Sequence, residues 1–92
     1  MVENIIDKIK REINSYINKS VIIIQDGFIQ SKYEIKTAQL SIDNEILSII
    51  NEEKITYLKI NLNQIYKFDS DNSKLVFYMD NDTIITIQKD RL

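Results

Sequence analysis

The sequence contains no cysteine, histidine, tryptophan or proline, and it has a single glycine in 92 residues. The absence of cysteine excludes disulfides and thiolate metal sites. The absence of histidine removes the commonest general base and the commonest metal ligand. An enzyme built from this chain would therefore rely on carboxylates, on lysine, or on the hydroxyls of serine, threonine and tyrosine.

Charge and chain length restrict the class of protein further. The 12 Lys and Arg residues are outnumbered by 14 Asp and Glu residues, and the net charge of −2 does not favour nucleic acid or an anionic membrane. Apolar runs are far shorter than the roughly 20 residues that cross a membrane, and the first residues do not resemble a secretory signal. We therefore expect a single domain, residues 1–92, that is cytoplasmic and binds no cofactor. The abundance of Ile, Asn and Lys indicates a low-GC genome.

The first segment has the period of an amphipathic helix. Asp7 and Arg11 stand four residues apart in the favourable acid-first order. Asn18 tolerates the left-handed conformation that ends many helices. The pattern predicts a helix over about 2–17. Its apolar stripe comprises Val2, Ile5, Ile6, Ile9, Ile13, Tyr16 and Ile17.

After Lys19 the apolar period changes to that of strands, in a chain with twenty β-branched isoleucines. Asp26-Gly27 separates two apolar runs and is typical of a two-residue hairpin turn. This turn would place Ile24 opposite Ile29. The core face would then carry Ile22, Ile24, Ile29, Tyr33 and Ile35.

The later strands alternate with polar turns, in which Asn and Asp replace Gly and Pro. The apolar positions change parity between Ile35 and Ala38, which predicts a bulge or bend near Lys36-Thr37. We therefore predict an α+β fold with a β meander over about 20–89. In this fold an N-terminal amphipathic helix packs on a strongly bent antiparallel sheet or small barrel of five to seven strands.

Two resemblances in the order of elements agree with this fold. A helix followed by curved strands, with 24–28 (Ile-Gln-Asp-Gly-Phe) at the first hairpin, resembles Sm/Hfq-like barrels. The spacing of Ile60, Leu62, Ile65 and Phe68, followed by a loop and a hairpin, resembles the later strands of pleckstrin-homology-like domains. Neither resemblance implies a function for this chain, because one fold hosts many functions.

Catalytic and metal sites find little support in the sequence. The acids lie mostly in turns at alternating ends of a meander, whereas paired catalytic carboxylates must converge. Asp69-x-Asp71 begins like a calcium loop, but Lys74 occupies the position that requires glycine. We therefore predict no catalytic residue and no metal site, and we expect a protein that is not an enzyme.

A nucleic-acid interface is an open alternative. Lys8, Arg11 and Lys19 recur along one side of the predicted helix and could meet phosphates. Lys59 shares a strand face with Tyr57, as in platforms that combine aromatic and positive side chains. A pI of about 5.0 favours instead a solvated charged face.

The leading hypothesis is a protein-contact surface on the outer face of the predicted sheet. If alternate residues of the last hairpin face the core, the residues between them point outward, and contiguous outward apolar side chains mark protein interfaces. The predicted function is a non-enzymatic interaction module: an adaptor, an inhibitor or a homodimeric accessory protein, and one that could be encoded by a phage or plasmid. Its partner would be another protein or a second copy of the chain, with no membrane contact. The other open interpretation of the outward apolar residues is that the sheet is covered on both faces. The candidate contact residues are Tyr57, Val76, Tyr78 and Ile84.

Overall fold

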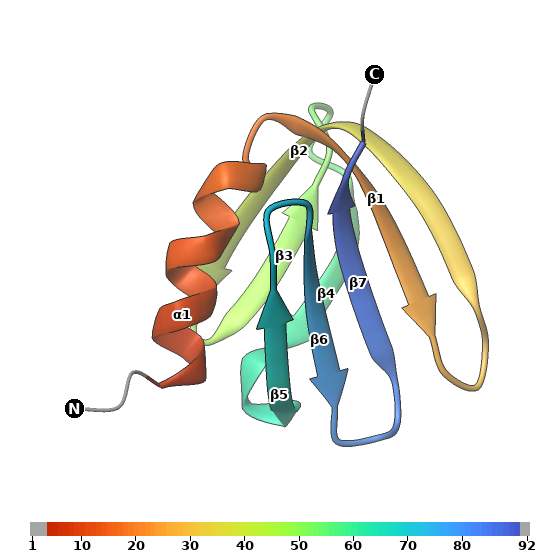
Figure 1. Cartoon of the computed structure of the whole chain (residues 1–92). Coiled ribbons are helices and arrows are strands. Elements are labelled where there is room, and N and C mark those ends of the chain that lie inside the picture. Colours follow the sequence, from red (N-terminus) through yellow and green to blue (C-terminus); the bar gives the residue numbers. More distant parts are fainter. Residues whose placement is uncertain (1–3, 91–92) are drawn as a thin grey trace.

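The computed structural model describes residues 4–90, in which one helical segment precedes seven strands (Figure 1). Helix α1 spans Ile5–Glu12 and continues as a 3-10 helix, η1, over Ile13–Tyr16. A second 3-10 helix, η2, spans Leu62–Gln64 and connects β4 to β5. The predicted α+β fold is confirmed. The strands are β1 Lys19–Asp26, β2 Ser31–Asp43, β3 Ile46–Ile50, β4 Thr56–Asn61, β5 Ile65–Ser70, β6 Lys74–Met79 and β7 Ile84–Lys89.

The strands form one antiparallel sheet in the order β4-β3-β2-β1-β7-β6-β5. β4 and β5 are its two edges although only η2 separates them in the chain, so the sheet bends strongly to bring both edges to this short segment. The Leu62 N–H donates to the Glu45 carbonyl (2.9 Å) and the Asp80 N–H to the Gln64 carbonyl (2.8 Å), which ties η2 to two hairpin turns. The edges do not pair with each other, so the predicted bent sheet is confirmed as open rather than closed into a barrel.

The helical segment packs against the concave face of the sheet. Helix α1 lies against β5, and η1 lies against β1 and β2 (Figure 1). The Asn4 side chain caps α1 by accepting the Asp7 N–H (2.8 Å). Asn18 follows η1 with φ of 63°, as predicted. Val2 of the predicted stripe lies outside the described residues, and no helix in residues 4–90 is both long and apolar enough to cross a membrane.

One hydrophobic core fills the space between the helical segment and the sheet. Alternation along each strand directs every second side chain into it. Its buried members are Ile9, Ile13, Tyr16, Val21, Ile23, Ile35, Ala38, Leu40, Leu47, Ile49, Ile60, Leu62, Ile65, Phe68, Leu75, Phe77, Met79, Ile85 and Ile87.

The bulge predicted near Lys36-Thr37 is confirmed. Lys36 and Thr37 together stand opposite the single residue Ser20 of β1. The Ser20 hydroxyl donates to the Lys36 carbonyl at 2.8 Å. Because of the extra residue, both Ile35 and Ala38 are buried although three positions separate them.

The predicted two-residue turn at Asp26-Gly27 is wrong. β1 continues to Asp26 and β2 begins at Ser31, so residues 27–30 form the connection. Ile24 pairs with Lys32 and does not face Ile29. Gly27 does not adopt the positive φ that the predicted turn requires at both central positions.

This register also corrects the predicted core of the first hairpin. Val21 and Ile23 are fully buried, whereas Ile22 and Ile24 lie half-buried on the outer face of β1. Ile29 is 69% exposed in the hairpin connection. Tyr33 is half-buried, and Ile35 is buried as predicted. In an apolar run the two faces are chemically alike, so the neighbouring elements decide which face is buried.

A turn with two positive-φ residues joins β2 to β3 instead. Asn44 and Glu45 have φ of 52° and 62°, which matches the right-handed twist of the flanking strands. Lys54 in the β3–β4 turn and Asp82 in the β6–β7 turn also adopt positive φ. The predicted polar turns are therefore present, although Glu and Lys share the left-handed positions with Asn and Asp.

Candidate functional site

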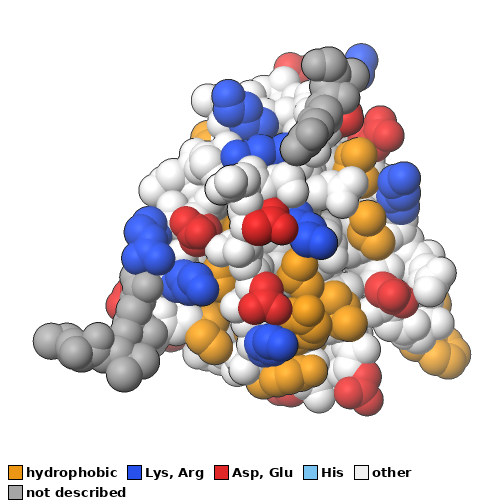
Figure 2. Space-filling model, in the orientation of Figure 1, with side chains coloured by type: hydrophobic (Ala, Val, Ile, Leu, Met, Phe, Trp, Pro, Cys, Tyr) orange, Lys and Arg blue, Asp and Glu red, His pale blue; other side chains and the backbone are white. Residues whose placement is uncertain are grey.

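Three of the four predicted contact residues come together on the outer face of the sheet. Tyr78 on β6 pairs with Ile84 on β7, and Val76 lies two residues before Tyr78 on the same face. The ring of Tyr66, on β5, lies beside Tyr78 with the centroids 6.3 Å apart. Figure 2 shows hydrophobic side chains gathered over β5, β6 and β7, with charged side chains around them. We call Tyr66, Val76, Tyr78 and Ile84 the outer patch.

A bulge at the start of β5 positions Tyr66. The pairing register with β6 shifts between Ile65 and Lys67, which leaves Tyr66 as the extra residue, 63% exposed. The sequence prediction did not single out Tyr66. The sequence feature that indicates the bulge at Tyr66 is the spacing of two apolar residues, Ile65 and Phe68. They are three residues apart and both buried, and this spacing interrupts strand alternation.

One cation lies over the aromatic centre of the outer patch. The Lys67 Nζ is 5.0 Å from the Tyr78 ring centroid, within the range of a cation–π interaction. The same Nζ lies 3.8 Å from Asp69 Oδ2, and both side chains are more than half exposed. Since exposed ion pairs contribute little stability, Lys67 is available to a carboxylate placed against the patch.

Tyr57 does not join the outer patch. It lies on β4, at the opposite end of the strand order from β5. Its ring stacks on Tyr33, with centroids 5.8 Å apart and planes at 25°, and the Tyr33 hydroxyl donates to the Tyr57 carbonyl at 3.5 Å. Burial raises the pKa of Tyr33 above its ordinary value. Tyr57 is therefore part of a separate tyrosine pair.

The four candidate nucleic-acid contacts come from three elements. Lys8 and Arg11 lie on α1, Lys19 begins β1 and Lys59 lies on β4. Two strands separate β1 from β4 in the sheet, so the strand order does not bring Lys59 beside Lys19. Lys8 is half-buried, with its Nζ 5.7 Å from the Phe68 ring centroid.

The acidic segment that begins like a calcium loop forms a closed turn. Asp71 Oδ1 accepts hydrogen bonds from the Ser73 N–H (2.8 Å), the Ser73 hydroxyl (3.0 Å) and the Lys74 N–H (3.0 Å). These bonds, that of the Ser73 N–H foremost, hold the pKa of Asp71 below its usual range. Within residues 4–90, no group of three His, Cys, Asp or Glu side chains is placed to hold a metal ion.

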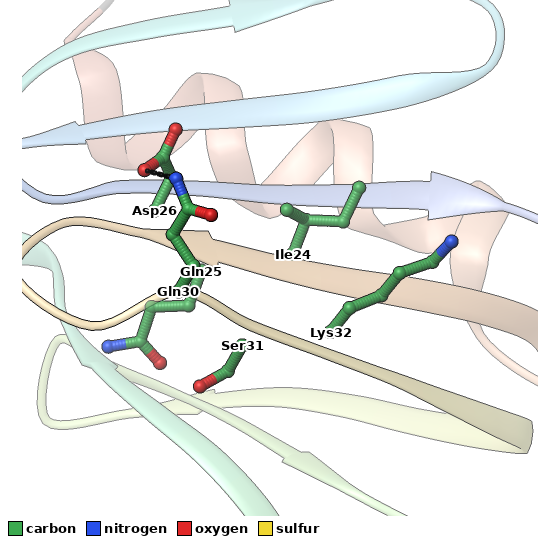
Figure 3. Close-up of a pocket in the computed structure, with 6 residues that line it drawn as sticks. All are labelled: Ile24, Gln25, Asp26, Gln30, Ser31 and Lys32. Atoms are coloured by element: carbon green, nitrogen blue, oxygen red, sulfur yellow. Dashed lines mark hydrogen bonds between the residues drawn. The ribbon is translucent and has the colours of Figure 1, made fainter.

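The β1–β2 hairpin carries an apolar tip and a shallow cavity. Phe28 is fully exposed at the tip, beside Ile29, because the connection is longer than predicted. The Gln30 amide donates to the Asp26 carboxylate at 3.1 Å (Figure 3). Asp26 and Lys32 give the cavity mixed charge, which provides no convergent catalytic pair. The cavity measures about 320 Å³ and is lined by Ile24, Gln25, Asp26, Gln30, Ser31 and Lys32.

Comparisons of the chain with protein-family models, with curated proteins and with solved structures found no match in any of the three.

Proposed function

We propose that this protein is a non-enzymatic protein-interaction module that binds another protein through the outer patch. The supporting observation is that Tyr66, Val76, Tyr78 and Ile84 adjoin one another on a face where no described helix packs. The helical segment packs on the opposite, concave face, where alternate residues of the same strands are buried. Tyrosine and apolar side chains are common at the centres of protein interfaces.

The exposed area favours a separate partner over a second copy of the chain. A fully accessible aromatic side chain offers about 150–250 Å². Tyr66 is 63% and Ile84 37% exposed, while Val76 and Tyr78 are half-buried. The outer patch alone therefore falls below the roughly 800 Å² per partner of a standard stable interface. This area suits a transient contact with a protein that places apolar side chains on the tyrosines and a carboxylate on Lys67.

The test is a charge introduced at the centre of the outer patch. In Tyr78→Glu, a carboxylate replaces the ring that contacts Tyr66 and Lys67, and we expect affinity for the partner to fall by about 30-fold, the loss of a hot spot worth roughly 2 kcal/mol. Ser41→Glu is the matched control, because Ser41 is an exposed strand residue on β2 outside the patch. Affinity capture from the source cell identifies the partner, and titration of the purified partner measures the affinity.

Three results would contradict the proposal. The first is equal affinity of Tyr78→Glu and wild type for the captured protein, when circular dichroism shows the same fold. The second is a dimer in sedimentation equilibrium that Tyr78→Glu dissociates, which would make a second copy the occupant. The third is salt-sensitive retardation of single-stranded nucleic acid that Lys19→Glu or Lys59→Glu abolishes, which would favour the alternative function.

A further inference from the structure

A second pocket, of about 220 Å³, lies between the helical segment, the β5–β6 turn and the end of β7. Its charged lining residues are Glu12 and Asp71, which are acidic, and Lys89. Leu75 and the ring of Tyr16 add an apolar wall. The Lys89 Nζ is already placed over the Tyr16 ring, 4.9 Å from its centroid. The lining therefore carries an excess of one negative charge.

The hydroxyl of Tyr16 is the unusual group in this pocket. Tyr16 is 1% exposed, and its Oη has no hydrogen-bond partner among the described residues. Burial raises the pKa of Tyr16 to about 12, and the charges of Asp71 and Glu12 add to the increase. The hydroxyl is therefore neutral, and Tyr16 lines the same pocket as the two carboxylates. Buried hydroxyls are normally paired, because an unpaired one loses its bonds to water without replacement.

Each of the two carboxylates is held by the protein through one oxygen only. Glu12 Oε1 accepts the Ser70 hydroxyl at 2.9 Å, and Asp71 Oδ1 accepts the three donors of its own turn. Within residues 4–90, Glu12 Oε2 and Asp71 Oδ2 accept no hydrogen bond. The pocket thus combines two oriented but unpaired carboxylate oxygens with one unpaired phenol oxygen.

We propose that this pocket binds the primary ammonium group of an alkylamine, with Glu12, Asp71 and the Tyr16 hydroxyl as acceptors and with Leu75 beside the alkyl chain. An ammonium group carries three N–H donors, which equals the number of unpaired oxygens. Its charge neutralises the excess negative charge of the lining. The site is separate from the outer patch, because Leu75 faces the core whereas Val76 faces outward.

The lining favours ammonium over other small ions. An anion would meet two carboxylates. A divalent cation prefers six or more oxygen ligands with several carboxylates, whereas this pocket has two carboxylates and a lysine. The shared chemistry is an alkylammonium group, which could be supplied by a free amine or by a lysine side chain of a bound peptide.

The test is a titration of the full chain followed by amide chemical shifts around the pocket. The probes are n-butylammonium and capped lysine (Nα-acetyl-lysine methylamide), and the controls are n-butanol, which lacks charge, and tetramethylammonium, which lacks N–H donors. We expect saturable shifts at Ser15 and Asn72 with both amines and none with the controls. Tighter binding of capped lysine would identify a peptide as the source, and equal binding a free amine. No saturable shift with either amine, or an equal response to tetramethylammonium, overturns the proposal.

Two variants test the assigned acceptors. Tyr16→Phe keeps the ring and removes only the hydroxyl, and Glu12→Gln keeps an oxygen for Ser70 and removes the charge. We expect each variant to weaken amine binding by about tenfold, as expected for the loss of one hydrogen bond to a charged group. Glu53→Gln, at an exposed acid in the β3–β4 turn, is the control and should bind as wild type. Unchanged affinity in both Tyr16→Phe and Glu12→Gln would exclude these acceptors.

Discussion

Replacing Tyr16 by phenylalanine should stabilise the free protein, although most changes in a core are destabilising. The ring of Tyr16 is buried and its Oη has no partner among the described residues. In the unfolded chain water bonds to this hydroxyl, and no described residue replaces that bond on folding. Tyr16→Phe removes only the group that is unpaired and preserves the packing of the ring against Lys89 and the core.

The magnitude follows from the desolvation of one neutral hydroxyl. A buried unsatisfied donor costs roughly 1–3 kcal/mol, so the free energy of unfolding of Tyr16→Phe should exceed that of wild type by an amount in this range. In a domain of this size each 1 kcal/mol raises Tm by about 4–8 °C. Urea unfolding followed by circular dichroism should show a higher midpoint with an unchanged m-value.

Tyr66→Phe is the control for this prediction. It removes a hydroxyl from a ring that is 63% exposed, so its midpoint should stay close to that of wild type. If Tyr16→Phe is less stable than wild type, the hydroxyl has a partner in solution, such as an ordered water, and the reasoning fails.

Three further outcomes follow from the same structure. Folding raises the pKa of Tyr16 from 10.0 to about 12, so between these pH values the native state retains a proton that the unfolded chain loses. Wild type should therefore lose stability relative to Tyr16→Phe as the pH rises from 10 to 12. Urea midpoints of the two proteins that run parallel over this range would contradict the prediction. Ile9 is fully buried on α1, so Ile9→Asp places a carboxylate in the core at a cost comparable to the whole stability of a domain, roughly 5–15 kcal/mol. Circular dichroism should show that Ile9→Asp is unfolded and that the control Asn14→Asp, at an exposed position, is folded. A thermal melt of Ile9→Asp that matches wild type would refute the packing of α1 on the sheet. A Cβ on Gly27 would lie 2.9 Å from Thr83 Oγ1, so Gly27→Ala should lower the free energy of unfolding by about 1 kcal/mol. Adding Thr83→Ala to the same chain should recover most of this loss. If the two effects are additive in the double-mutant cycle, the two residues do not touch.

The outer patch could be predicted only in part from the sequence. Alternation along β6 and β7 is sufficient to place Val76, Tyr78 and Ile84 on one face, because successive side chains of a strand point in opposite directions. It could not exclude Tyr57, whose place depends on the order of strands in the sheet. It also missed Tyr66, which reaches Tyr78 through a bulge in the pairing of β5 with β6.

Local chemistry by itself determined the N-terminal helical segment, the left-handed conformation of Asn18 and the bulge at Lys36-Thr37. Each of these depends on residues close together in the chain, and period and turn preference describe such residues well. Only the tertiary structure decided the register of the first hairpin, where Val21 to Ile24 are apolar on both faces and Gly27 does not form the expected turn. Only the tertiary structure brought Tyr16, Asp71 and Glu12 to one pocket, because long-range packing joins segments that no local pattern relates.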